Sequence, residues 1–357
     1  MQYRQLGKWG VRLSTAGLGS YLTIGDHISD EVSRQCVRRA IELGINWFDT
    51  ANAYNRGRAE EVLGECLSEF PRDSFVLATK VYGRMGEGPN DRGLSAKHIN
   101  EQCNASLRRL KMDYIDIYFC HRPDPHTPLE ETIRAMEDLA RQGKIFYWGV
   151  SEWPPGLIAE AVGLAREMNC RPPVVNQPRY SLLYRHPEIE VFPLCQKEGL
   201  GQVVFSPLAH GVLTGKYKPG EEPPAGTRGA DPKQSRTMKT LYWGDEILTN
   251  VQAMAGIAKE MGLTTAQLAI AWCLHHPAVT SVILGATRVE QIEENVGASD
   301  VTIPDDVAEK LDELFPEPPF PGLPQDRRRF YPSARGQERR SQNRPREHRR
   351  DRSTERD

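Results

Sequence analysis

Four ionisable residues each stand at or just beyond the end of an apolar run: Asp49, Tyr54, Lys80 and His121. Taken singly, each has an ordinary structural explanation. An aspartate can begin a turn, a tyrosine can pack, a lysine can end a strand in water, and a histidine can be a satisfied core residue. Brought together, the four would form a group able to transfer a proton.

The chemistry of such a group is the protonation of an oxygen that gains negative charge. A free phenol has a pKa of about 10, and we expect a neighbouring ammonium, that of Lys80, to lower the pKa of Tyr54. Asp49 would keep Lys80 charged and oriented, and His121 would hydrogen-bond a substrate oxygen. This arrangement suits a carbonyl group whose carbon receives a hydride.

Such residues need elements that bring them together, and the chain alternates short apolar runs with longer segments of helical period. The runs predict strands at 13–19, 45–50, 74–80, 114–121, 145–151, 173–177, 202–206 and 279–285. The segments predict helices at 29–43, 57–70, 95–110, 128–142, 154–168, 187–198, 246–275 (broken near Gly262) and 287–298. Ser95, Thr127 before Pro128, and Thr287 with Glu290 are the expected helix-start signals.

The strand runs are almost continuously apolar, which indicates parallel strands covered on the outside by helices. Eight such units in about 300 residues predict an α/β fold of the (β/α)8 TIM barrel type, whose active site lies at the carboxyl ends of the strands. The competing fold is an open doubly wound sheet. Its dinucleotide fingerprint would need Gly or Ala where Leu22 stands, so Gly17 and Gly19 are interpreted as ending a strand tightly, and the barrel is preferred.

Both ends of the chain differ from this pattern. Residues 3–14 predict a small β-hairpin that caps the bottom of the barrel, and the barrel domain is expected to span 1–315. Residues 316–325 are rich in proline and are expected to form a linker. The tail, 326–357, holds twelve arginines and six acids and is predicted to be disordered.

Charge separates the tail from the rest, because the tail carries a net +6 and the preceding residues −8 within a total of −2. An acidic body lacks the basic surface that nucleic-acid binding needs, so nucleic-acid binding is not expected outside the tail. For the tail itself, a solvated extension is preferred over contact with RNA or an acidic partner.

Other patterns exclude whole classes of protein. No run approaches the roughly 18 apolar residues of a spanning helix, and the start of the chain lacks a signal-peptide core, so a cytoplasmic protein without membrane contact is expected. The seven scattered cysteines form no C-x-x-C pair, which argues against disulfides and structural zinc. His126 and the pair His275–His276 lack ligand partners at suitable spacing, so no metal is assigned.

The segments "DTANAY", "AEEVLG", "LATK" and "DYIDIYFCHRPDP" resemble the aldo-keto reductase superfamily over about residues 1–315. The superfamily's Asp, Tyr, Lys, His tetrad matches Asp49, Tyr54, Lys80 and His121. "HRPDPHTPLEETIRAM" and "AIAWCLHHPAVTSVILGATRVEQIEENVGA" resemble the branch of potassium-channel β subunits and bacterial glyceraldehyde-3-phosphate and methylglyoxal reductases. The channel subunits carry Asn where this chain has His121, which favours an NADPH-dependent aldehyde and ketone reductase. The alternative is an NADPH-binding regulatory protein with slow turnover.

The resemblance also implies the cofactor, NADPH, held across the barrel mouth without a separate dinucleotide domain. The nicotinamide end is implied at Gly19, Ser20, Tyr21, Asp49, Ser151 and Gln177, with Ser151 and Gln177 bonding its amide. The pyrophosphate loop is implied at Ser206, Pro207, Leu208, Gly211 and Lys216. The adenosine phosphate is implied at Arg228 (with Arg236 as the alternative), Gly285, Thr287, Arg288, Gln291, Glu294 and Asn295.

Lys216, Arg228 and Arg288 would suit a 2′-phosphate, so NADP is preferred over NAD. The aromatic residues Tyr21, Tyr82 and Trp153 either line the pocket for a small carbonyl substrate or pack. The long loops 84–94 and 216–245 would shape that pocket. By the same resemblance, the chain is expected to form a homo-oligomer, a tetramer or larger ring.

Overall fold

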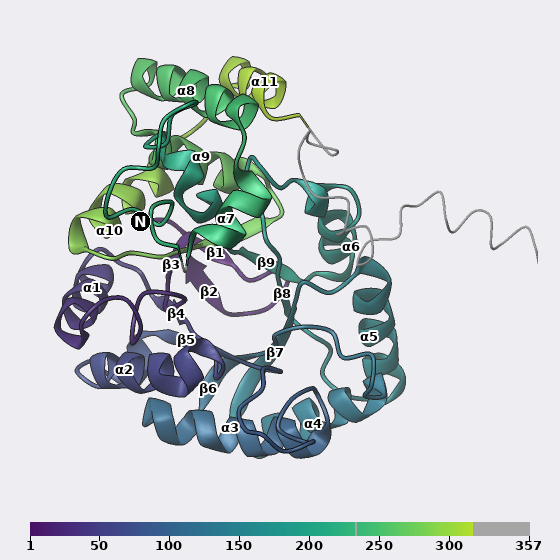
Figure 1. The fold of residues 1–357 in the computed structure, drawn as a ribbon. Helices are drawn as coiled ribbons and strands as arrows, with labels where there is room; N and C mark the ends of the chain where they lie inside the picture. Colours follow the sequence, from purple (N-terminus) through teal and green to yellow (C-terminus); the bar gives the residue numbers. More distant parts are fainter. Residues whose placement is uncertain (233, 317–357) are drawn as a thin grey trace, which may run out of the picture. The chain divides into compact units, whose positions relative to one another are not determined.

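Eight parallel strands close into a barrel in the computed structural model, which describes residues 1–232 and 234–316 (Figure 1). Consecutive strands are neighbours throughout, and the last strand pairs with the first, Val282 opposite Ala16. The predicted (β/α)8 barrel is therefore confirmed. Its strands are β3 (Ala16–Gly19), β4 (Trp47–Asp49), β5 (Val76–Val81), β6 (Ile115–Cys120), β7 (Ile145–Ser151), β8 (Val175–Gln177), β9 (Gly201–Val204) and β10 (Val279–Leu284).

Helices surround the barrel on its outer side (Figure 1). Seven of them match predicted segments closely, and the segment at 246–275 is two helices, α8 and α9, separated at Gly262 as expected. The helices are α1 (Asp30–Glu42), α2 (Arg58–Leu67), α3 (Ala96–Leu110), α4 (Leu129–Arg141), α5 (Pro155–Glu167), α6 (Val191–Glu198), α7 (Ser235–Tyr242), α8 (Asp245–Glu260), α9 (Thr265–His275), α10 (Val289–Val296) and α11 (Asp305–Leu314).

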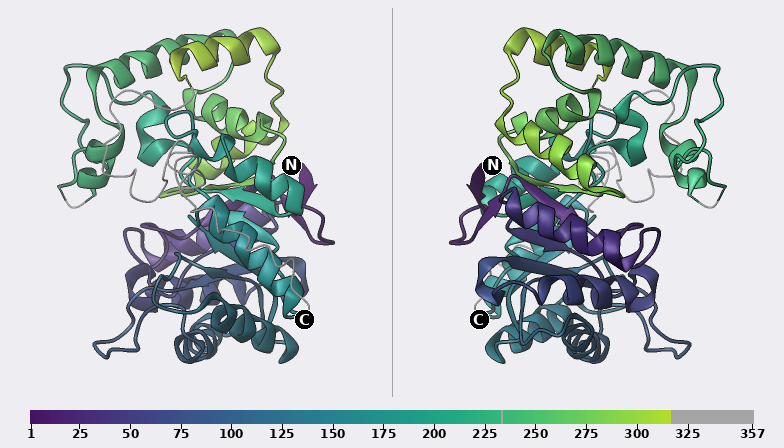
Figure 2. Two further views of the ribbon diagram at one scale, coloured as in Figure 1. Left: turned by 90° about the vertical axis from the view of Figure 1, so that its right-hand side faces the viewer. Right: turned by 90° about the vertical axis from the view of Figure 1, so that its left-hand side faces the viewer.

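Helices α8 and α11 form an additional layer outside helix α9. Helix α9 is buried on nearly every side because it lies between strand β10 and helix α8. Figure 2 shows α11, in yellow-green, alongside α8, and the two pack together. An all-round apolar helix needs such cover, since no face of it suits water. Helices α7 and α11 were not predicted, and α7 lies inside the segment 216–245 that was expected to be a loop.

The helix starts confirm some predicted signals and correct others. Ser95 caps α3, accepting a hydrogen bond from the backbone N–H of His98 at 3.2 Å. Thr127 does not cap α4: its hydroxyl donates to Asp124, and Pro128 is the N-cap. The predicted box of Thr287 and Glu290 is also wrong. Thr287 donates instead to the side chain of Gln291, which is four residues away and can reach back to it.

A two-stranded hairpin closes the bottom of the barrel, as predicted. Strands β1 (Tyr3–Gln5) and β2 (Arg12–Ser14) pair antiparallel, and the Arg4 guanidinium donates to the carbonyl of Val279, where β10 begins. The apolar run at 13–19 is therefore divided between the hairpin and barrel strand β3. Gly17 lies inside β3 rather than ending it. A Cβ there would meet the Trp47 ring at 2.1 Å, so the interpretation of Gly17 as a strand-ending residue is corrected.

All seven cysteines are buried and free. Among residues 1–232 and 234–316, no helix is long and apolar enough to cross a membrane. The predicted tail (326–357), and the predicted linker apart from Pro316, lie outside the described residues.

Candidate active site

The four predicted residues meet at the carboxyl ends of three neighbouring strands. Asp49 ends β4, Lys80 lies near the end of β5, and His121 follows β6 directly. Tyr54 opens a short 3-10 helix, η1 (Tyr54–Gly57), in the connection after β4. The strand order places β4, β5 and β6 side by side, so residues far apart in the chain share one mouth of the barrel.

Lys80 is the centre of this group. Its side chain has no exposed surface, and its Nζ donates to Asp49 Oδ2 at 2.5 Å, to the Thr50 carbonyl at 2.9 Å and to Tyr54 Oη at 3.3 Å. An ammonium has three hydrogens, and these three acceptors account for all of them. The His121 ring meets the Tyr54 ring edge to face, with centroids 5.6 Å apart. The geometry therefore joins the phenol to both a cation and an imidazole.

The protonation states of these groups are set first by burial. Burial raises the pKa of Tyr54 well above its ordinary value, and the Asp49 carboxylate raises it further. This corrects the expectation of a lowered pKa for the phenol, because desolvation of a phenolate outweighs the opposing effect of the nearby cation Arg122. Burial likewise lowers the pKa of Lys80, against the opposing effect of Asp49.

Burial lowers the pKa of His121 well below its ordinary value, and the cations Lys80 and Arg122 lower it further. At neutral pH, the site therefore presents a protonated phenol beside a neutral imidazole. A neutral imidazole still carries one N–H that can donate to an oxygen. Both groups at the barrel mouth are thus hydrogen-bond donors.

The turn that carries Tyr54 has an unusual backbone. Three consecutive residues after it have positive φ: Asn55 at 44°, Arg56 at 52° and Gly57 at 95°. Non-glycine residues adopt this left-handed region at a cost, and such residues persist where the surrounding structure holds them. The Asn55 side-chain amide does so on one side, donating to the Gly25 carbonyl at 2.6 Å.

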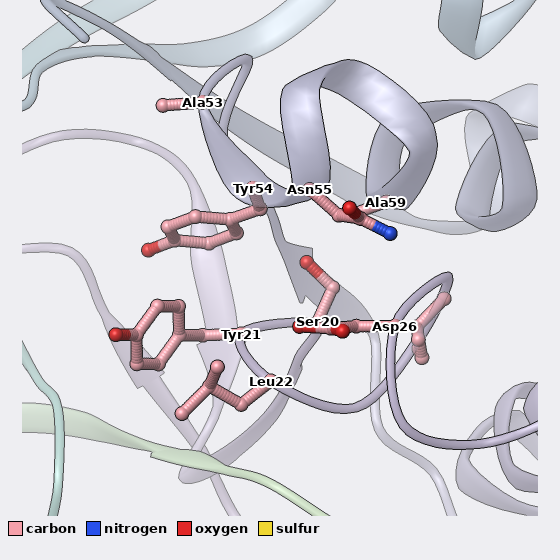
Figure 3. Close-up of a pocket in the computed structure, with 9 residues that line it drawn as sticks. Ser20, Tyr21, Leu22, Asp26, Ala53, Tyr54, Asn55 and Ala59 are labelled. Atoms are coloured by element: carbon pink, nitrogen blue, oxygen red, sulfur yellow. The ribbon is translucent and has the colours of Figure 1, made fainter. Parts of the chain in front are cut away.

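A small cavity lies against this turn, with the rings of Tyr21 and Tyr54 on one side of it (Figure 3). The two rings are 5.0 Å apart between centroids. In Figure 3 both hydroxyls point away from Asp26, Asn55 and Ala59, which line the opposite side. The cavity therefore lies behind the Tyr54 ring and not at its reactive oxygen.

Comparison with known proteins agrees with this geometry. The sequence of residues 15–315 matches the Aldo/keto reductase family. The chain belongs to this family. It is 44% identical over 304 residues to an Arabidopsis thaliana protein named "Probable voltage-gated potassium channel subunit beta", covering 84% of this chain and 92% of that protein. It is 41% identical over 324 residues to an Oryza sativa subsp. japonica protein of the same name, covering 89% and 98%.

The branch predicted from the sequence thus fits the names that these relatives carry. For an aldo/keto reductase, the residues implied at the nicotinamide end lie on the strand ends next to the tetrad. Ser20 is buried and donates to the Thr50 hydroxyl at 2.8 Å, and Gly19 ends β3 opposite Asp49. Tyr21 is 55% exposed, and its ring lies against that of Tyr54 at a tilt of 52°.

Ser151 and Gln177 end neighbouring strands, as predicted, and both are buried. The Ser151 hydroxyl donates to the backbone carbonyl of Gln177 at 2.8 Å, and the Gln177 amide donates to Asp49 Oδ1 at 2.9 Å. Asp49 is therefore held on both carboxylate oxygens, one by Lys80 and one by Gln177. Among the described residues, the Gln177 carboxamide oxygen accepts no hydrogen bond and is free for a ligand.

Three predicted cations lie near one another. Lys216 is exposed, but the groups around it lower its pKa by desolvation, and Arg228 and Arg288 lower it further. The Arg228 guanidinium is half-buried, and its own pKa is lowered by that burial. Arg236, the alternative to Arg228, is exposed on helix α7. The structure thus groups Arg228 with the other two cations, and this repulsive cluster suits a multiply charged anion.

The remaining implied cofactor residues fall on two segments. Ser206, with a positive φ of 59°, and Pro207 and Leu208 follow β9 and lead into the 3-10 helix η4 (Ala209–Thr214). Gly211 lies in η4, where a Cβ would come within 3.2 Å of Lys216 Nζ. The other members follow β10 or lie on helix α10: Gly285, Thr287, Arg288, Gln291, Glu294 and Asn295.

The aromatic residues were expected either to line the substrate pocket or to pack in the core. Trp153 is 2% exposed and packs in the core, whereas Tyr82 is half-buried with the Arg92 guanidinium 5.7 Å above its ring. Sequence reasoning missed Arg122. This cation follows His121 directly, donates to the His121 carbonyl at 2.6 Å and lies 3.4 Å from the Ser151 hydroxyl. Its position in "CHRPDP" was the available signal, since it continues a strand end already assigned to the site.

Proposed function

We propose that this protein reduces aldehydes and ketones to alcohols with NADPH, and that Tyr54 is the general acid. The observation that carries the proposal is the Tyr54 phenol, which lies 3.3 Å from the buried Lys80 ammonium with the neutral His121 ring beside it. A protonated phenol between two further donors is suited to an oxygen that becomes negative during reaction.

NADPH, when bound, supplies the hydride that the carbonyl carbon receives. Tyr54 donates its proton to the carbonyl oxygen, and burial keeps that proton on the phenol until then. As the proton leaves, negative charge grows on Tyr54 Oη, and the hydrogen bond from Lys80 strengthens because its acceptor is now charged. An interaction that strengthens during the reaction accelerates it. His121 donates its single N–H to the same carbonyl oxygen and fixes its position.

The cation cluster supports NADPH over NADH. Arg228 and Arg288 both repel the Lys216 ammonium, and a 2′-phosphate would relieve that repulsion. Ser151 and Gln177 would hold the nicotinamide amide, since Gln177 keeps a free carboxamide oxygen beside the tetrad. The segments after β9 and β10 would hold the phosphates, with helix α10 presenting its first N–H groups.

Tyr54→Phe tests the proposal. Removal of a general acid lowers kcat by about 10²- to 10⁴-fold. NADPH consumption with methylglyoxal or 4-nitrobenzaldehyde measures kcat, and NADPH fluorescence measures cofactor affinity, which should not change. Tyr114→Phe, at the bottom of the barrel before β6, is the matched control and should keep the wild-type rate. Full activity in Tyr54→Phe would exclude Tyr54 as the proton donor.

A second function is favoured by the names of the relatives. Two proteins at 44% and 41% identity are named as potassium-channel β subunits, so an NADPH-binding regulatory protein with slow turnover is the alternative. Tight NADPH binding combined with negligible turnover over a broad panel of carbonyls would support it. The presence of His121 favours the reductase, because the resemblance implies Asn at this position in channel subunits.

A further inference from the structure

A buried charged network adjoins the tetrad without being part of it. Glu60, on helix α2, has no exposed surface. Its Oε2 accepts a hydrogen bond from Arg109 Nε at 2.6 Å, and its Oε1 accepts one from the Thr79 hydroxyl at 2.5 Å. Both carboxylate oxygens are therefore committed, one to a cation and one to a hydroxyl.

Glu60 joins helix α2, which follows Tyr54, to strand β5, which carries Lys80. Helix α2 begins at Arg58, directly after the turn that carries Tyr54. Thr79 immediately precedes Lys80 in β5, and neighbouring side chains of a strand point to opposite faces. Thr79 thus reaches the helix layer while Lys80 faces the barrel mouth. Any displacement of α2 relative to β5 must stretch a short hydrogen bond to Glu60.

Arg109, from helix α3, contacts the same turn directly. A Cβ at Gly57 would lie 2.7 Å from Arg109 Cδ and 2.8 Å from its Nε, so the arginine side chain lies against the turn's backbone. Gly57 is the last of the three residues with positive φ. The left-handed turn is therefore held by Arg109 at its end and by the Asn55 amide at its beginning.

Stability alone does not account for this network. A buried ion pair can often be replaced by apolar side chains of similar volume without loss of stability, since desolvation offsets the attraction. A hydrogen-bonded pair does fix geometry, because both groups need their partners at defined distances and angles. The network lies between the carrier of Tyr54 and the carrier of Lys80, where geometry affects proton transfer.

We propose that Glu60 and Arg109 are positioning residues, whose ion pair holds the strained Tyr54 turn against strand β5 and so keeps the phenol within reach of Lys80. This inference rests on the proposed function of Tyr54 as proton donor. Neither residue touches the tetrad oxygens. Both act through the backbone of the turn and through Thr79, and the Glu60 carboxylate also raises the pKa of Lys80 from a distance. Loss of the pair lets Tyr54 move away from Lys80 and slows proton transfer without affecting the cofactor site.

The test compares this pair with a similar pair at the other end of the barrel. Arg72 donates to Asp116 Oδ2 at 2.5 Å; the two side chains are 20% and 13% exposed, against 18% and 0% for Arg109 and Glu60. Glu60→Gln removes a buried charge and Asp116→Asn a half-buried one, and each leaves an arginine without its partner, so each should lower the melting temperature. Only Glu60→Gln should lower kcat, by about tenfold or more, with the KM for the carbonyl unchanged.

Two additional variants separate positioning from simple destabilisation. Arg109→Lys keeps the charge and should recover part of the rate lost in Arg109→Met. The double variant Glu60→Gln with Arg109→Met leaves no unpaired buried charge, so it should fold even if a single variant does not. Its kcat should be no lower than that of the worse single variant, because the two residues act as a unit.

A readout independent of turnover decides the inference even if the protein reduces no carbonyl. The Cζ resonance of Tyr54 in 13C-tyrosine-labelled protein, assigned with Tyr54→Phe, should shift or broaden in Glu60→Gln and stay in place in Asp116→Asn. An unchanged resonance in Glu60→Gln would overturn the inference, as would a kcat within twofold of wild type. An inactive wild-type protein would overturn the proposed function alone.

Discussion

At the scale of single residues, Lys80 determines what the site can do. Its three donors are committed to Asp49, the Thr50 carbonyl and Tyr54, so it has no hydrogen left for a substrate. It therefore acts on the reaction through Tyr54. The carboxylate of Asp49, held by Gln177 on its other oxygen, fixes the direction in which the ammonium points.

The Asp49→Asn variant should change the pH dependence of the rate. Burial lowers the pKa of Lys80, and Asp49 is the main opposing influence, so removing the carboxylate lowers that pKa further. The amine then loses its charge at lower pH, and the alkaline limb of kcat moves to lower pH. We expect a loss of about tenfold or more on the alkaline side and a smaller loss on the acid side.

Values of kcat measured between about pH 5.5 and pH 9 check this prediction. This range lies below the ordinary lysine pKa of about 10.4, so a loss of rate within it reports a lowered pKa. The asparagine oxygen can still accept from Gln177, but Lys80 loses the charge of its buried partner, so the melting temperature should fall as well. Parallel pH profiles for the variant and the wild type would contradict the argument.

The sequence predicted which residues meet at the site but not how they titrate. Asp49, Lys80 and His121 could be placed because each ends an apolar run, and strand ends meet at one mouth in a barrel. The pKa of Tyr54 was predicted in the wrong direction because sequence reveals a neighbouring cation but not the extent of desolvation. Arg122 was missed because it faces the mouth from a loop, where no periodicity indicates direction.

At the scale of elements, prediction succeeded where one periodic pattern dominates and failed where side chains compete. The eight apolar runs could only be buried strands at that spacing, and each became one. Helix α7 lies in a segment rich in Gly and Pro, whose loop-like composition concealed an eight-residue helix. At Thr287, two acceptors competed for the same cap, and Gln291 reached it where Glu290 did not.

Helix α9 gives a test of local helix chemistry. The Thr264 hydroxyl accepts from the Gln267 N–H at 3.2 Å, and the Gln267 side chain accepts from the Thr264 N–H at 3.0 Å. Thr264→Ala should lower the free energy of unfolding by about 1 kcal/mol, as measured by urea denaturation. Thr249→Ala, at an exposed interior position of α8, is the matched control and should cost nothing. Equal losses in both variants would refute the capping assignment.

At the scale of the whole molecule, three histidines on separate elements link stability to pH. Burial lowers the pKa values of His98, His121 and His186 in the folded state. Each is near its ordinary value of about 6.5 in the unfolded chain, so the unfolded state gains protons first as pH falls. The stability that these neutral histidines contribute is therefore complete above about pH 6.5. It is lost as the pH falls from there towards their lower pKa values in the folded state.

Unfolding free energies measured in urea at about pH 7.5, 6.5 and 5.5 should decrease with a slope of up to about 4 kcal/mol per pH unit, the limit for three protons. His98→Gln should make the slope shallower. A stability that is flat over this range would contradict the argument. Carboxylates also affect the pH dependence of stability, but only at lower pH. One example is Asp124, whose hydrogen bonds lower its pKa despite burial.

Barrel closure is also a property of the whole chain. Strand β10 pairs with β3 across about 266 residues of sequence, as Val282 pairs with Ala16. Eight similar units predicted that closure, because a barrel removes the exposed edges that an open sheet would leave.

The buried cysteines can report which parts of the fold open locally. They lie on different units around the barrel, and burial raises the pKa of Cys36 to about 11 and that of Cys103 to about 12. A thiol reagent attacks the thiolate of an accessible residue, so modification must await local opening. The order in which labelled peptides appear in a mass spectrum therefore gives the order in which the strand–helix units open.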